Sequence, residues 1–190
     1  MSTSRVVDID RIDLEILALL QEDGRKSLVD IARAVGLTHP SVRARIKRLV
    51  DSGVAKVSAL VDPRSLGLRL AFVNALVEDV IAAYSDLSKL CECPRIVMAS
   101  VKGGSRNVSM LVLYRDPREV EAFVNKILSR VRGVKSLDIE LDAIIKPRHL
   151  PVDVARALRG CGCDCSSCPM RLEPIECPGC CLRSLAGGSR

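Results

Sequence analysis

The chain has 190 residues, of which 48% are apolar and 27% charged, and its formal net charge is +6. Charge or glycine interrupts every apolar run before ~20 residues, which excludes a membrane-spanning helix, and the length allows two small cores. No apolar run follows a basic start, so we expect no export signal and a cytoplasmic protein. A charge of +6 is by itself only a weak indication of nucleic-acid binding.

Three helices are predicted at the N-terminus. Apolar residues recur at helical spacing from Asp10 to Gln21. Ser27 caps a second helix, which stops at Gly36, and Thr38 caps a third helix. Because only a tight turn fits between the second and third helices, the pattern predicts a helix-turn-helix.

The third helix carries a basic outer face. Four of its apolar residues are expected to face the other helices: Val42, Ile46, Leu49 and Val50. The first turns of such a helix contact base edges in the major groove, and the residues expected there are Thr38, His39, Ser41, Arg43 and Ala44. The cations expected to contact phosphate are Arg45, Lys47 and Arg48. An ordinary solvated face is the alternative, but cap, turn and basic face coincide.

An α+β domain is predicted after this unit. Its strands are expected at Leu70–Val77, Arg95–Val101, Val108–Tyr114 and Val134–Ile145, and its helices at Val80–Cys91 and Pro117–Val131. The order βαββαβ makes a four-stranded antiparallel sheet with two helices on one face, a ferredoxin-like arrangement. We therefore expect a DNA-binding domain at 1–53, a linker at 54–68, a sheet domain at 69–148 and a tail at 149–190.

Seven of the nine cysteines lie in the last thirty residues. Cysteines separated by two residues can turn both thiolates toward one ion, and the pairs Cys165/Cys168 and Cys177/Cys180 have this spacing. Eight residues separate the pairs, which predicts a small metal knuckle. The complete set of candidate ligands is Cys161, Cys163, Cys165, Cys168, Cys177, Cys180 and Cys181.

The donor set leaves the metal open. Four thiolates suit structural Zn²⁺, whereas seven soft sulfurs exceed what one zinc needs and favour Cu(I), Cd²⁺ or a small cluster, with an iron–sulfur cluster as a further option. A disulfide scaffold is the alternative, because intracellular proteins of hyperthermophiles can be rich in disulfides. Cys91, Cys93 and His149 are interpreted as ordinary core or surface residues outside the main site.

Several segments match a known signature. They are Asp10–Leu17, Ile31–Thr38, Val42–Leu49, Ser52–Val54, Asp62-Pro63 and Leu66-Gly67. In these segments the chain resembles the Lrp/AsnC, or feast/famine, transcriptional regulators. The resemblance implies a (winged) helix-turn-helix, a hinge strand over Val54–Val61 and a ferredoxin-like effector domain, known as a RAM domain. It also implies a homodimer or higher even-numbered homo-oligomer on a pseudo-palindromic DNA operator.

The resemblance indicates two candidate effector sites, a turn in the sheet domain and the cysteine-rich tail. Amino-acid-sensing members carry Gly and then Asp at the turn between the second and third strands, and the matching candidates here are Gly103, Gly104, Ser105 and Asn107. Since the neutral Asn107 offers no charge to an amino group, the tail becomes the better candidate, although a plain turn is also possible. Some archaeal members end in a cysteine-rich extension of the TRASH type, linked to copper response. The present tail is similar but shorter.

We therefore predict a sequence-specific transcriptional regulator that responds to a thiophilic metal: Cu, Zn or Cd. The alternatives are an amino-acid sensor with a structural zinc tail, a metal-storage protein, and an enzyme. Related folds serve as sirohaem decarboxylases, but the two histidines, His39 and His149, both lie outside the predicted sheet domain. We therefore do not expect an enzyme.

Overall fold

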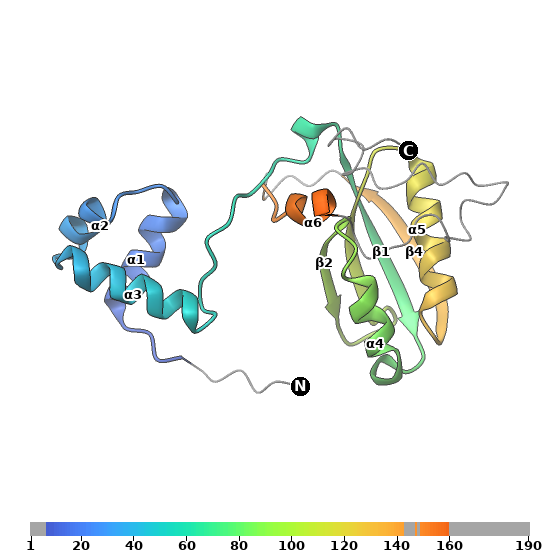
Figure 1. The fold of residues 1–190 in the computed structure, drawn as a ribbon. Helices are drawn as coiled ribbons and strands as arrows, with labels where there is room; N and C mark the ends of the chain where they lie inside the picture. The colour runs from blue at the N-terminus through green and yellow to red at the C-terminus, as the bar shows by residue number, and fades with distance from the viewer. Residues whose placement is uncertain (1–6, 143–146, 148, 160–190) are drawn as a thin grey trace. The chain divides into compact units, whose positions relative to one another are not determined.

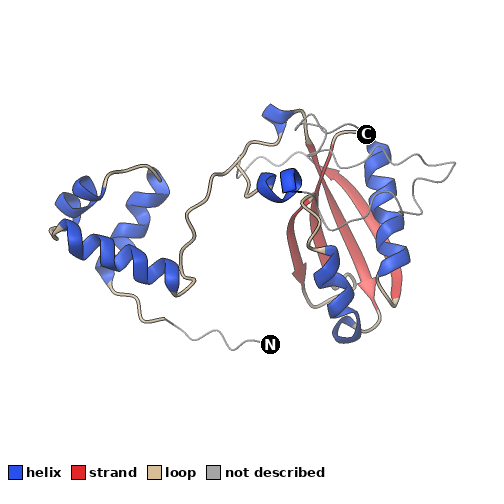
Figure 2. Cartoon of the chain, viewed as in Figure 1, coloured by secondary structure: helices blue, strands red, loops and turns tan. Residues whose placement is uncertain are grey.

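The computed structural model describes residues 7–142, 147 and 149–159. The chain divides into two compact units, Met1–Ala59 and Leu60–Arg190. The first unit is helical, and the second contains the sheet (Figures 1 and 2). The cysteines from Cys161 to Cys181, and with them the predicted metal knuckle, lie outside the described residues.

Three helices form the first unit, and a side chain caps the start of each. Their bounds are α1 (Arg11–Glu22), α2 (Leu28–Val35) and α3 (His39–Asp51). The caps Asp10, Ser27 and Thr38 each accept a hydrogen bond from the backbone N–H three residues further on. The predicted helices are confirmed, with Asp10 as the cap of α1 rather than its first residue.

A tight turn joins α2 to α3. Gly36 ends α2 with a φ of 68°, in the left-handed region that glycine adopts without a steric cost. Ile16, Ile31 and Val42 are fully buried where the three helices meet. Val50 was expected in this core but is 42% exposed, because it lies at the edge of the α3 stripe. Residues 7–59 contain no strand, so the described helix-turn-helix has no wing.

The segment after α3 is not the expected hinge strand. Residues 55–60 have no regular secondary structure. Val61 alone is paired, in an isolated antiparallel bridge with Leu150. A strand needs a neighbour to satisfy its backbone groups, and the described part of the chain places none beside residues 55–60.

The second unit contains one four-stranded antiparallel sheet in the order β2-β3-β1-β4. The strands are β1 (Arg69–Val77), β2 (Ile96–Val101), β3 (Val108–Tyr114) and β4 (Val134–Asp142). The helices are η1 (Arg64–Leu66), α4 (Val80–Leu90), α5 (Pro117–Arg130) and α6 (Val154–Arg159). The predicted α+β fold is confirmed for the helix-turn-helix and the sheet.

Both α4 and α5 cover one face of the sheet (Figure 1). The apolar side chains buried between these helices and the sheet include Val73, Met110, Leu87 and Phe123. Leu128 of α5 lies at the edge of this core and is 52% exposed. Because side chains alternate along a strand, Leu70, Leu111 and Leu113 point to the opposite face. A second cluster buries them there, and its other buried members are Leu68, Leu150 and Val152.

Candidate nucleic-acid interface

The start of α3 presents the residues that were predicted to contact bases. All five are exposed: Thr38, His39, Ser41, Arg43 and Ala44. Two of them also build the cap, since the Thr38 Oγ1 lies 2.9 Å from the Ser41 Oγ and accepts from the Ser41 N–H at 3.4 Å. The cap thus fixes the backbone of the first turn while the other side chains of that turn point to solvent.

Arg43 is the arginine of α3 that has no partner within the described residues. Its side chain is exposed, and no hydrogen bond or ion pair to it is found in that part of the chain. A guanidinium in this state has no internal contact to break before it binds a base or a phosphate. Arginine is also the side chain that most often recognises guanine in the major groove, through two parallel hydrogen bonds.

Arg45 and Arg48 have a different role, because carboxylates of α1 hold both. The Arg45 Nη1 lies 2.7 Å from the Asp10 Oδ2 and 2.9 Å from the Asp13 Oδ1. The Arg48 Nη2 bonds the other Asp13 oxygen, and its Nη1 donates to the Asp8 carbonyl at 3.0 Å. We call Asp10, Asp13, Arg45 and Arg48 the Asp13 cluster. It ties α3 to the start of α1.

Asp13 is fully buried, yet its carboxylate stays charged. Burial alone raises its pKa, but the hydrogen bonds from Arg45 and Arg48 outweigh that effect and lower the pKa to about 2. Asp13 also completes a capping box, since its side chain accepts from the Asp10 N–H at 3.1 Å. Neither Asp10 nor Asp13 was among the predicted site residues. Two acidic residues spaced three apart at a helix start were the available signal.

The phosphate contacts expected of Arg45 and Arg48 stay a prediction, and the Asp13 cluster is an internal role that the sequence did not indicate. Lys47, the third expected phosphate ligand, is exposed and pairs with Asp51, one turn further along α3. Exposed pairs of this kind contribute about 0.3–0.5 kcal/mol, so phosphate can replace Asp51 at little cost.

The turn between β2 and β3 contains the candidate effector residues. Gly103, Gly104 and Ser105 are exposed there, but Asn107 is half-buried. The Asn107 side chain binds the backbone of Val77, because its Oδ1 accepts from the Val77 N–H at 2.8 Å and its Nδ2 donates to the Val77 carbonyl at 2.7 Å. Both of its polar groups are therefore engaged inside the protein.

Arg106 holds the same turn from the other side. Its Nε bonds the Asp138 carboxylate and its Nη1 donates to the Ser136 Oγ at 2.8 Å, both on β4. The Arg106 hydrogen bond lowers the pKa of Asp138. These contacts attach the turn to β4.

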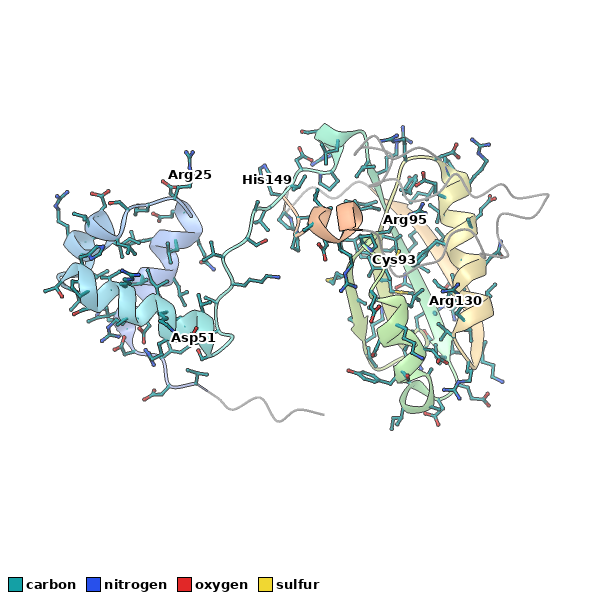
Figure 3. The ribbon with its side chains drawn as sticks, viewed as in Figure 1. Arg25, Asp51, Cys93, Arg95, Arg130 and His149 are labelled. Carbon is teal, nitrogen blue, oxygen red and sulfur yellow. The ribbon has the colours of Figure 1, made fainter. Side chains whose placement is uncertain are left out.

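The described residues contain two cysteines and no cluster of three or more metal-binding side chains. Cys91 is exposed at the end of α4, and Cys93 is buried in the core beneath the helices. Although Cys91 is largely exposed, partial desolvation raises the pKa of its thiol, which disfavours the thiolate that binds metals. His149 is exposed (Figure 3). In the same part of the chain, no helix has the length and apolarity to cross a membrane.

Comparison with known proteins identifies the first unit. Residues 9–50 match the AsnC-type helix-turn-helix domain. Over 144 residues the chain is 32% identical to an HTH-type transcriptional regulator of Pyrococcus horikoshii. This match covers 75% of the present chain and 91% of the relative. A second regulator, from Pyrococcus furiosus, is 34% identical over 130 residues, 67% of this chain and 84% of the relative.

A solved structure extends the likeness to both units. The leucine response regulatory protein of Mycobacterium tuberculosis is 26% identical, with a TM-score of 0.63 over 72% of this chain and 94% of that protein. The two sequence relatives and the solved structure thus belong to the same class of protein. The chain belongs to the Lrp/AsnC family and is a DNA-binding transcriptional regulator rather than an enzyme.

Proposed function

We propose that the protein recognises its operator with the first turns of α3, from Thr38 to Ala44, and that Arg43 makes the principal base contact. The observation that carries this proposal is the division among the arginines of α3. Arg43 is exposed and unpaired within the described residues, whereas Arg45 and Arg48 are held by Asp13.

We further propose a homodimer, or a higher even-numbered homo-oligomer, on a pseudo-palindromic operator. Two recognition helices related by two-fold symmetry contact half-sites about 34 Å apart, one turn of DNA. His39 and Ala44 flank Arg43 on the exposed side of α3, where an apolar or polar contact to a neighbouring base adds specificity. In this arrangement Lys47 contacts phosphate.

The test compares Arg43→Ala with Arg25→Ala. Arg25 is an exposed arginine of the turn between α1 and α2, and its side chain points away from the three helices (Figure 3). Both substitutions remove one positive charge. We expect Arg43→Ala to weaken operator binding about 5- to 150-fold, which corresponds to about 1–3 kcal/mol of binding free energy. The variant should also lose discrimination at one base pair.

Binding should change less than about threefold for Arg25→Ala, measured by fluorescence anisotropy on operator and scrambled DNA. Equal losses in the two variants, on both DNA sequences, would mean that Arg43 contributes only charge. A salt titration adds a second criterion, because each lost phosphate contact reduces the slope of log affinity against log salt by about 0.9.

We also propose that the cysteine-rich tail binds a thiophilic metal and that the metal changes operator affinity. The support is the donor set: two Cys-x-x-Cys pairs and three further thiols within 21 residues, from Cys161 to Cys181. Thiolate ligands of this number favour Zn²⁺, Cu(I) or Cd²⁺, and an iron–sulfur cluster is the remaining option. Metal binding supplies folding free energy to a segment with few apolar residues of its own.

Elemental analysis of anaerobically purified protein, with operator binding before and after metal removal, tests this second proposal. Tightly held metal whose removal changes affinity at least fivefold is the expected result. Stoichiometric zinc with unchanged affinity would make the tail structural. The search for an effector would then return to the backbone amides of Gly103 and Gly104, since the Asn107 side chain is engaged by Val77.

A further inference from the structure

A backbone bridge connects the end of the linker to the segment that precedes the cysteine-rich tail. Val61 and Leu150 form an antiparallel bridge with two hydrogen bonds, from the Val61 N–H to the Leu150 carbonyl at 2.9 Å and from the Leu150 N–H to the Val61 carbonyl at 2.8 Å. Val61 lies two residues after Ala59, where the DNA-binding unit ends. Leu150 lies eleven residues before Cys161.

The Leu150 side of this pair is packed firmly on the sheet. Leu150 and Val152 are 6% and 8% exposed and share an apolar cluster with Leu70, Leu111 and Leu113. Val61 packs against the same cluster as a partly buried member. The bridge is therefore one edge of a small core on the sheet face that α4 and α5 leave open.

The chain beyond Leu150 is also attached, almost to the first tail cysteine. Asp153 accepts a hydrogen bond from the Arg156 N–H at 2.9 Å at the start of α6. The Arg156 Nη1 donates to the Glu92 carbonyl at 2.7 Å, in the turn between α4 and β2. Figure 3 shows α6 at this end of the sheet, near the labelled Cys93. Only Gly160 separates the end of α6 from Cys161.

On the Val61 side, the preceding chain is exposed to solvent. Residues 55–60 have no regular structure, and Val57 and Leu60 are largely exposed. Val61 is thus the first residue after α3 that the sheet unit holds. The next two residues, Asp62 and Pro63, are buried in the sheet unit. Opening the bridge lengthens the free linker by about one residue, or ~3.5 Å, which is close to the ~3.4 Å rise of one base pair.

We infer that the Val61–Leu150 pair relays the metal state of the tail to the linker of the DNA-binding unit. This inference rests on the proposed metal response. In this relay, metal bound by the tail cysteines constrains α6 and Leu150, and the bridge passes that constraint to Val61. The length of free linker then sets how well two recognition helices match their half-site spacing.

The experiment uses the full chain with Val61→Pro, which removes the N–H that bonds Leu150, and with Val152→Ala, which loosens the cluster around Leu150. Ser58→Pro is the matched control, because Ser58 is exposed, lies in the same linker and makes no hydrogen bond within the described residues. Operator affinity is measured with metal removed and after adding Zn²⁺ or Cu(I). Bound metal is counted in every variant.

We expect wild type and Ser58→Pro to show the same ratio of affinities with and without metal, at least fivefold. That ratio should fall below about twofold in Val61→Pro and in Val152→Ala, although all variants bind the same amount of metal. An undiminished ratio in both variants overturns the relay and leaves the metal response standing. A wild-type ratio of one, or absence of bound metal, overturns the metal response and the relay with it.

Hydrogen exchange separates a relay from a merely structural bridge. If the inference holds, adding metal to wild type changes exchange of the Val61 and Leu150 amides by several-fold and leaves amides in the middle of β1 unchanged. Metal-dependent affinity without any change at these two amides means that the signal takes another route.

Discussion

The start of α3 and the turn between β2 and β3 were both predicted to bind a ligand, but the structure treats their polar side chains in opposite ways. At the start of α3, His39 and Arg43 are exposed and unpaired within the described residues. In the turn, Asn107 binds the Val77 backbone and Arg106 binds Asp138 and Ser136. Side chains already engaged inside the protein must give up those contacts before they bind anything else.

The same distinction divides α3 itself. Sequence alone groups four cations on one basic face, whereas the structure separates Arg43 from Arg45 and Arg48, whose guanidinium groups bind Asp13. A basic helix therefore contains residues that contact DNA and residues that hold the helix in place. Substitutions that act on stability and on DNA binding in different proportions test that separation.

The largest effect on stability is expected for Asp13→Ala. It removes a buried carboxylate, its bonds from two arginines and half of the capping box. We expect a loss of about 3 kcal/mol in the free energy of unfolding of the N-terminal unit, measured by urea denaturation followed by circular dichroism. Arg43→Ala is the control and should change stability by less than about 0.5 kcal/mol. Equal stability of Asp13→Ala and wild type would show that the cluster is not structural.

A smaller loss is expected for Asn107→Ala. Two hydrogen bonds to the Val77 backbone disappear, and we expect about 2 kcal/mol less stability in the sheet unit. Ser105→Ala, in the same turn, removes an exposed hydroxyl that makes no hydrogen bond within the described residues and should be neutral within about 0.5 kcal/mol. If Asn107 instead served only to bind a ligand, Asn107→Ala and Ser105→Ala would have the same free energy of unfolding in the absence of that ligand.

Acid should weaken the Asp13 cluster in a defined window. The pKa of Asp13 is lowered from 3.8 to about 2 in the folded protein, so its contribution is complete above pH 4 and is lost as the pH falls through about 2. Because its arginine partners are partly exposed, we expect this contribution to be about 1–2 kcal/mol. Asp13→Asn should have a correspondingly shallower stability profile between pH 4 and 2. An identical profile would contradict the assignment.

The smallest effect on stability is expected for Lys47→Ala. Its exposed pair with Asp51 contributes less than about 0.5 kcal/mol, so unfolding should hardly change. Operator binding should weaken uniformly across DNA sequences, and the salt slope should fall by about 0.9 if Lys47 contacts one phosphate. An unchanged slope would place Lys47 outside the interface.

Local sequence patterns predicted most of the fold. Ser27 and Thr38 cap α2 and α3 as predicted, and the strands and main helices of the sheet unit follow the predicted chain order βαββαβ. These features depend on neighbours within a few residues, so the chain specifies them directly. The prediction of a hinge strand was wrong because a strand requires a hydrogen-bonded neighbour, and residues 55–60 have none in the described part of the chain.

What the sequence determined by itself is the class of protein: a capped helix-turn-helix with a basic face, a ferredoxin-like sheet domain and a row of thiols. The tertiary structure alone decided which polar side chains are available, because that depends on contacts between distant residues. Arg45 reaches Asp13 across 32 positions and Asn107 reaches Val77 across 30, and no periodicity encodes either contact. Spacing places a side chain on a surface, but only packing decides whether it is already bound.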